Sequence, residues 1–119
     1  MFVTWVTARI FEVVSGACTT SSDQLCFASP NYPANYGVSQ TCTISVRDMV
    51  ILSVTAFELE SGYDNLTVNG IGYTASAGPE GVEVGAGSSI TFGSDGSNTR
   101  KGFYMCGTSG AHAFYGAHW

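Results

Sequence analysis

Short runs of alternating apolar and polar residues, separated by glycine, serine, asparagine and aspartate, fill most of the chain. Residues 42–46 alternate with a period of two, which is typical of a strand that buries one face. Residues 50–54 continue this pattern, but Phe57 and Leu59 follow it out of phase. A β-bulge near Thr55-Ala56 would return these two apolar side chains to the core.

A hairpin is expected next. Leu66 and Val68 form an inward-facing pair, Asn69-Gly70 is a strong signal for a tight turn, and Ile71–Tyr73 forms the return strand. Later segments of the same kind are Ser89–Phe92 and Gly102–Met105. Glycine and proline interrupt the stretches in which a helical period could begin. The pattern predicts an all-β fold, a jelly-roll-like sandwich of two antiparallel sheets.

Composition agrees with this fold and excludes some partners. The 119 residues suffice for one domain with its own core. Only 11% of residues are charged, whereas 15 are glycine and 13% are aromatic, which suits a turn-rich β protein. With four Lys and Arg and a net charge of −5, the chain is poorly suited to nucleic acid. No apolar run approaches the ~20 residues of a membrane span.

Four cysteines in so small a chain indicate two disulfides and an oxidising compartment. A zinc site is the structural alternative, but no CxxC or Cys/His spacing for zinc ligands is present. Four cysteines allow three connectivities, and the spacing alone leaves all three open.

The run Ser29–Tyr36 is the most specific stretch of the sequence. Its two prolines fix their own φ and hold the residues before them in extended backbone. Asn31 and Asn35 suit the turns between them. The segment therefore reads as a rigid loop that presents Tyr32 and Tyr36 at set positions.

Several segments follow this loop in a fixed order: Phe57-Glu58-Leu59-Glu60, Tyr63-Asp64, Phe92–Asn98 and Gly102-Phe103. In that order the pieces resemble a CUB domain, an extracellular β-sandwich module, and the resemblance covers about residues 18–106. It implies a disulfide between Cys18 and Cys42 on either side of the loop. Cys26 and Cys106 remain for a second bridge that departs from the family, whose usual second bridge begins shortly before the Asp64 position.

The resemblance divides the chain into three parts, with a CUB-like domain at residues 18–106. Residues 1–17 make a poor signal peptide, because Arg9 and Glu12 interrupt the apolar residues, and we expect a strand or a linker from a preceding region. Residues 107–119 are expected to be a Gly/His-rich tail or linker. Its His112 and His118 have no nearby carboxylate, so we expect solvated side chains rather than zinc ligands.

Three acids belong to the loops of this predicted sandwich. In the strand assignment Glu60 ends one strand, Asp64 begins its hairpin partner and Asp95 follows a later strand, so all three fall at one end of the sandwich. The resemblance implies that they bind Ca²⁺, which prefers six to eight oxygen ligands. It also assigns Ser97, through its main-chain carbonyl, and Asn98 as further oxygen donors, and Tyr36 as the phenol that bonds the acids. Turn acids without a metal are the plain alternative.

We expect a secreted or cell-surface module that binds a partner protein in a Ca²⁺-dependent manner. By resemblance Glu60, Asp64, Asp95 and Tyr36 also face the partner, whose Lys or Arg the acidic site receives. The alternatives are a carbohydrate-binding module, in which an exposed tyrosine such as Tyr63, Tyr73 or Tyr104 stacks on a sugar, and a structural spacer without an ion. An enzyme is not expected, because no Ser-His-Asp or Cys-His arrangement can be drawn.

Asn65-Leu66-Thr67 is a sequon for N-glycosylation. If Leu66 is buried, Asn65 faces outward and is available for modification, although a glycan there would crowd the edge next to Asp64. The sequence leaves open whether Asn65 carries one.

Overall fold

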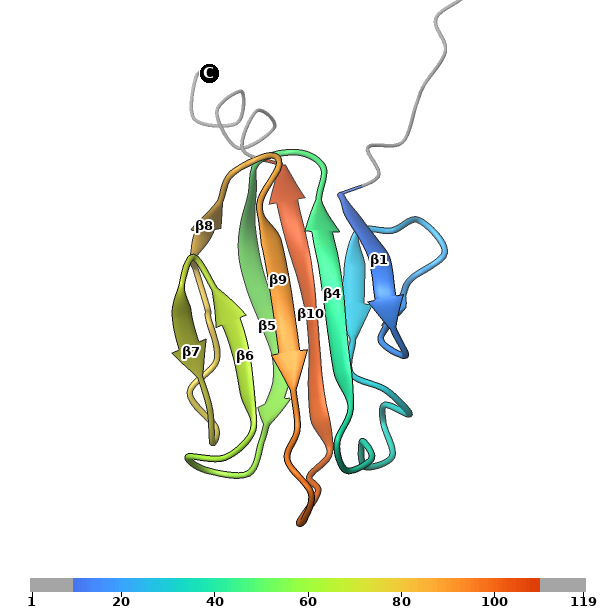
Figure 1. Cartoon of the computed structure of the whole chain (residues 1–119). Coiled ribbons are helices and arrows are strands. Elements are labelled where there is room, and N and C mark those ends of the chain that lie inside the picture. Colours follow the sequence, from blue (N-terminus) through green and yellow to red (C-terminus); the bar gives the residue numbers. More distant parts are fainter. Residues whose placement is uncertain (1–9, 110–119) are drawn as a thin grey trace, which may run out of the picture.

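The alternating segments form two antiparallel five-stranded sheets, which pack face to face in a computed structural model that describes residues 10–109 (Figure 1). The first sheet has the order β1-β4-β9-β6-β7, and the second has the order β2-β3-β10-β5-β8. The first comprises β1 (Phe11–Gly16), β4 (Thr41–Val46), β9 (Ser89–Gly93), β6 (Asn65–Val68) and β7 (Ile71–Tyr73). The second comprises β2 (Thr19–Thr20), β3 (Cys26–Ala28), β10 (Gly102–Ser109), β5 (Val50–Glu58) and β8 (Glu83–Val84). The predicted all-β sandwich is confirmed.

Side-chain alternation fills the space between the sheets. In β4 the side chains of Cys42, Ile44 and Val46 are buried, while the residues between them face outward. The centre of the core is aromatic: Phe27 and Phe92 each pack edge-to-face against Phe103, with ring centroids 5.8 and 5.3 Å away. Burying each of these rings contributes about 1.5–3 kcal/mol to folding.

The predicted β-bulge lies in β5. Tyr104 of β10 pairs with Ala56, and the next residue, Met105, pairs with Val54, so Thr55 is the extra residue. Because one residue is added, Leu52 before the bulge and Phe57 after it both face the core.

Both disulfides are present with the expected pairing. Cys18 and Cys42, with Cα atoms 5.8 Å apart, form a bridge inside the core. Cys26 and Cys106 are directly opposite each other on β3 and β10, and their bridge is half-buried. One bridge therefore stabilises the interior, and the other staples two neighbouring strands.

The two ends of the sandwich differ in what they carry. Phe11 pairs with Val46 and Ser109 with Val50, so both ends of the described chain lie beside the β4–β5 connection (Figure 1). The loops after β3, β5 and β9 lie at the opposite pole (Figure 1). The sandwich thus includes residues upstream of Cys18 and downstream of Cys106.

The expected segments 1–17 and 107–119 are described only in part, and His112 and His118 lie outside the described residues. Within residues 10–109, no helix is long and apolar enough to cross a membrane.

Candidate metal centre

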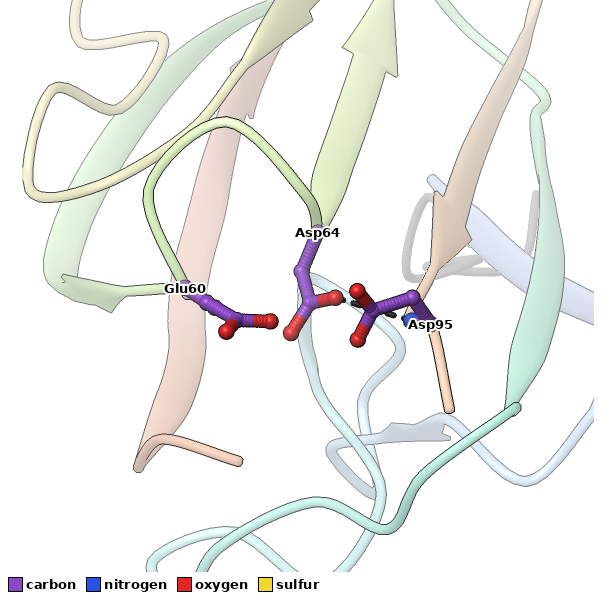
Figure 2. Close-up of side chains that lie close together, drawn as sticks. All are labelled: Glu60, Asp64 and Asp95. Atoms are coloured by element: carbon purple, nitrogen blue, oxygen red, sulfur yellow. Dashed lines mark hydrogen bonds between the residues drawn. The ribbon is translucent and has the colours of Figure 1, made fainter. Parts of the chain in front are cut away.

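Three carboxylates meet at the pole that carries the loops after β5 and β9. Figure 2 shows the side chains of Glu60, Asp64 and Asp95 pointing toward one another. One carboxylate oxygen from each residue lies within 4.8 Å of the other two. Asp64 is fully buried, Glu60 is 8% exposed and Asp95 is half-buried. The expected convergence of the three acids is observed, and such a group can hold a metal ion.

Asp64 is the hub of this acidic cluster, as we call Glu60, Asp64 and Asp95. Its Oδ2 accepts a hydrogen bond of 2.6 Å from the Tyr36 hydroxyl, and its Oδ1 accepts one of 2.8 Å from the backbone N–H of Asp95. A single carboxylate thereby fixes the loop after β9 and the loop after β3 against the start of β6.

Tyr36 supports the cluster from within the core. Its ring packs edge-to-face on Phe92 at 5.1 Å, and its backbone N–H donates to the carbonyl of Arg100. Besides donating to Asp64, its hydroxyl accepts a hydrogen bond of 3.1 Å from the backbone N–H of Glu60. Burial, and then the bond to Asp64, raise the pKa of Tyr36 well above its ordinary value. The phenol therefore stays protonated and acts as a donor.

The two carboxylate oxygens of Glu60 differ in their hydrogen bonding. Its Oε2 accepts a hydrogen bond of 2.8 Å from the side-chain amide of Asn98. Its Oε1 is buried and has no hydrogen-bond partner among the described residues. A buried carboxylate oxygen without a partner is costly, and its cost disappears when a cation binds it.

Ser97 and Asn98 both reach the cluster by hydrogen bonds. The backbone N–H of Ser97 donates to Oδ1 of Asp95 at 3.2 Å, which closes a turn typical of aspartate. Asn98 has a φ of 56°, a left-handed conformation that asparagine tolerates, and this places its amide on Glu60.

Thr74 holds the Glu60–Asp64 loop and was missed in the sequence. Its hydroxyl lies 3.0 Å from the carbonyl oxygen of Glu60 and 2.8 Å from that of Asp64, and it donates between them. It also accepts a hydrogen bond of 3.1 Å from the backbone N–H of Gly62. A threonine directly after the return strand β7 was the available signal, because a hairpin brings that position back to the loop.

Ser94 holds the loop after β9 against the loop after β3 by hydrogen bonds of its hydroxyl. Its hydroxyl donates to the carbonyl of Gly37 at 2.8 Å and accepts from the backbone N–H of Gln40 at 2.9 Å. The backbone N–H of Ser39 in turn donates to the carbonyl of Asp95 at 2.7 Å. The loops after β3 and β9 are therefore joined on both sides of Asp95.

The remaining candidate residues separate into two groups. Asn65 is exposed and follows Asp64 at the start of β6. Leu66 is fully buried, which agrees with the outward orientation expected for Asn65. Tyr63 is 66% exposed beside the cluster. Tyr104, by contrast, lies on β10 in the second sheet, where its ring packs on Tyr32 at 5.6 Å, and Tyr73 is half-buried on β7.

Comparison with protein families and with curated proteins gives no match for this chain. No protein-family model matches its sequence, and no curated protein matches it either. The chemistry of the acidic cluster is therefore the guide to its function.

Proposed function

We propose that this chain is an extracellular, CUB-like binding module that holds Ca²⁺ at Glu60, Asp64 and Asp95 and uses the site to bind a basic side chain of a partner protein. The observation that carries the proposal is Oε1 of Glu60, which is buried inside a group of three carboxylates and has no hydrogen-bond partner within residues 10–109 (Figure 2). A cation at this position would satisfy this oxygen and relieve the repulsion among the acids.

The chemistry of the donors favours Ca²⁺ over softer metals. All the donors of the cluster are oxygens, and the four cysteines are paired in disulfides, so no thiolate is available. Ca²⁺ accepts six to eight oxygens in flexible geometry, from carboxylates, carbonyls and water. The three acids would supply part of such a set. The contacts of Ser97 and Asn98 with the cluster are made by their N–H groups, so their oxygens would have to turn toward the ion to add to it.

A divalent cation would leave this site negative overall. Three carboxylates around one Ca²⁺ carry an excess of negative charge, and half-buried Asp95 leaves one side open to solvent. A Lys or Arg side chain from a partner fits that charge through charge-assisted hydrogen bonds. The net charge of −5 on the chain, like the local charge of the site, favours basic partners.

Two features of the chain support an extracellular location. Its two disulfides are typical of an oxidising environment. The sequon at Asn65 lies at an exposed position, where a secreted protein can be glycosylated.

Thermal melting in Ca²⁺ and in chelator tests the metal site. For the native chain we expect Ca²⁺ to stabilise the fold by about 2.7 kcal/mol at one hundred times Kd, a rise of roughly 10 °C or more in Tm. Asp95→Ala should abolish most of this rise. Glu60→Gln should also weaken it, while raising Tm in chelator, because its neutral amide can donate to the neighbouring carboxylates.

The matched control for Glu60→Gln is Glu83→Gln, which removes the same charge from an exposed position on β8. It should respond to Ca²⁺ like the native chain. Identical melting of the native chain in Ca²⁺ and in chelator would overturn the metal site.

Binding of a basic side chain is tested with a small probe. Nα-acetyl-lysine amide, whose side-chain ammonium is free, should shift the NMR signals of residues 60–64 and 95–98 in Ca²⁺ and leave them unchanged in chelator. N-acetyl-norleucine amide, which lacks the charge, is the control. Added salt should weaken the interaction, because the contact is electrostatic and exposed. Equal shifts with both probes would contradict a charge-specific site.

A further inference from the structure

We propose that the outer face of the first sheet, next to the acidic cluster, binds a neutral glycan. This face holds a shallow depression of about 480 Å³ over β4, β9 and β6. Thr41, Thr43, Tyr63, Asn65, Thr67 and Thr91 contribute polar groups to its lining, together with Ser94 and Asp95. We call this surface the hydroxyl face. The proposal does not require bound Ca²⁺, although Asp95 lies at the boundary between the two sites.

The sheet register aligns the hydroxyl groups in a row. Thr43 of β4 pairs with Thr91 of β9, and Thr91 pairs with Thr67 of β6. Neighbouring strands lie about 4.7–4.9 Å apart, so the three threonines follow one another across the sheet at about that spacing of their backbones. Each hydroxyl both donates and accepts, as the hydroxyl groups of a sugar do. A straight row of such groups can bind several hydroxyls of one saccharide at once.

Glycine makes room above this row. Gly93 faces outward between Thr41 and Asn65, and a Cβ added to it would meet no atom within 4 Å. Gly72 leaves space for Asn65, whose Oδ1 lies 3.3 Å from the position that a Cβ would take. The lack of a side chain at Gly93 therefore keeps the centre of the face open to a ligand, and Gly72, on the edge strand β7, gives room to the side chain of Asn65.

Tyr63 supplies the apolar contact that sugar binding requires. Its side chain is 66% exposed and forms part of the lining of the depression. The flat ring of an exposed tyrosine can stack on the apolar face of a pyranose while the hydroxyls bind elsewhere. An aromatic ring beside a row of hydroxyl and amide groups thus matches both the apolar face and the hydroxyl groups of a sugar.

The charges of the hydroxyl face favour a neutral ligand. Among the residues that the structure describes, no Lys, Arg or His lines the depression, so a sulfated, phosphorylated or sialylated ligand would find no counter-charge there. The charged residue in the lining is Asp95, which would repel an anion. Neutral hexoses and their oligomers therefore fit this surface best.

The neutral glycan can come from two sources. One is a glycan on a partner molecule, and the other is an N-glycan on Asn65, which itself lines the depression. The two share the same sugar chemistry. A protein made without glycosylation, and the same protein from a secretory host before and after endoglycosidase treatment, distinguish them.

The test is an NMR titration of the unglycosylated, disulfide-bonded protein with mannose, galactose, glucose, N-acetylglucosamine and their dimers, in Ca²⁺ and in chelator. We expect saturable shifts at Thr43, Tyr63 and Thr91 with at least one neutral sugar. Tyr63→Ala and the isosteric Thr91→Val should each raise Kd about fivefold or more.

Tyr104→Ala and Thr108→Val are the matched controls, because they remove the same groups from β10 in the other sheet. They should leave Kd unchanged. The proposal is overturned if no neutral sugar binds, if sialylated or sulfated sugars bind more tightly, or if binding survives both variants of the hydroxyl face. The sugar titration in chelator tests the hydroxyl face without Ca²⁺, whereas thermal melting tests the Ca²⁺ site. Failure of one proposal can therefore be told apart from failure of the other.

If the host-glycosylated protein binds free sugar only after endoglycosidase treatment, its own glycan occupies the hydroxyl face. If it binds equally before and after treatment, the glycan comes from a partner. Both results support the site.

Discussion

The hydroxyl of Tyr36 joins segments that are far apart in the sequence. It donates to the buried carboxylate of Asp64 and accepts from the backbone N–H of Glu60. Both groups are removed from solvent, so water cannot replace the phenol easily. The same atom thus connects the rigid loop after β3 to the acidic cluster.

Tyr36→Phe should therefore destabilise the protein far more than the loss of one oxygen suggests. It leaves an acceptor of Asp64 and a donor of Glu60 unsatisfied in a buried place, which costs about 2–4 kcal/mol. Urea denaturation measures the change in the free energy of unfolding. Tyr104→Phe, whose hydroxyl makes no hydrogen bond to the described residues, should stay within about 0.5 kcal/mol of the native chain.

The pH dependence of that difference gives a second check. Because the pKa of Tyr36 is raised above the ordinary value of 10.0, its stabilisation is complete below pH 10 and decreases as the pH rises above it. The gap in stability between the native chain and Tyr36→Phe should be constant near neutral pH and shrink above pH 10. A gap that grows with alkaline pH would contradict the donor role of the phenol.

At the scale of elements, the β6–β7 hairpin has a turn that depends on its sequence. Asn69 and Gly70 have φ values of 54° and 78°, the left-handed pair required by a type I′ turn. The side-chain amide of Asn69 also donates to the carbonyl of Glu83 at 2.9 Å, which ties the turn to β8. This hairpin delivers Thr74 to the loop that carries Glu60 and Asp64.

Gly70→Ala should lower the free energy of unfolding by about 1–2 kcal/mol, because an L-residue is strained at that φ. Thermal or urea denaturation measures the loss. Gly93→Ala is the control, since Gly93 lies in the extended backbone of β9 with open space at its Cβ, and it should be neutral or slightly stabilising. Equal stability of both variants would show that the turn tolerates other conformations.

Local patterns predicted the elements whose geometry is set by neighbouring residues. The bulge at Thr55 followed from a change of phase between Val54 and Phe57, and the hairpin followed from Asn69-Gly70. β2 and β8 have two residues each, too short to show a period, and were not predicted.

The sequence predicted the candidate site only to the extent that it predicted where the strands end. Placing Glu60, Asp64 and Asp95 at one pole required the strand order in the chain and no detail of the sheets. The hairpin itself brings Thr74 back to the Glu60–Asp64 loop, but the contacts of Ser94 and Asn98 depend on how separate loops pack, and no local pattern reports that. The hydroxyl face likewise depends on β9 lying between β4 and β6, which are not its neighbours in the sequence.

At the scale of the whole molecule, the two disulfides restrain the chain over different lengths. Cys26 and Cys106 are 80 residues apart in the sequence, and Cys18 and Cys42 are 24 apart. In the chain-entropy model, the longer closure stabilises more, by about 4–5 kcal/mol against about 3–3.5 for the shorter one.

The double variant Cys26→Ser/Cys106→Ser should therefore lose about 4–5 kcal/mol while it keeps a single cooperative transition in urea. Its half-buried position on β3 and β10 makes serine acceptable there. Ca²⁺ should still stabilise this variant, because the bridge lies away from the acidic cluster. A loss below about 1 kcal/mol would show that the reduced, unfolded chain is already restrained.

The path of the backbone also decides how the module can be attached to anything else. Phe11 and Ser109 lie beside the β4–β5 connection, and the carboxylates lie at the far pole. A tether that joins the sandwich directly at Phe11 or Ser109, whether to a sensor chip, a bead or a neighbouring domain, would leave the cluster pointing away from its support. Immobilisation at this end of the sandwich is thus the orientation in which the acidic cluster stays free to capture its ligand.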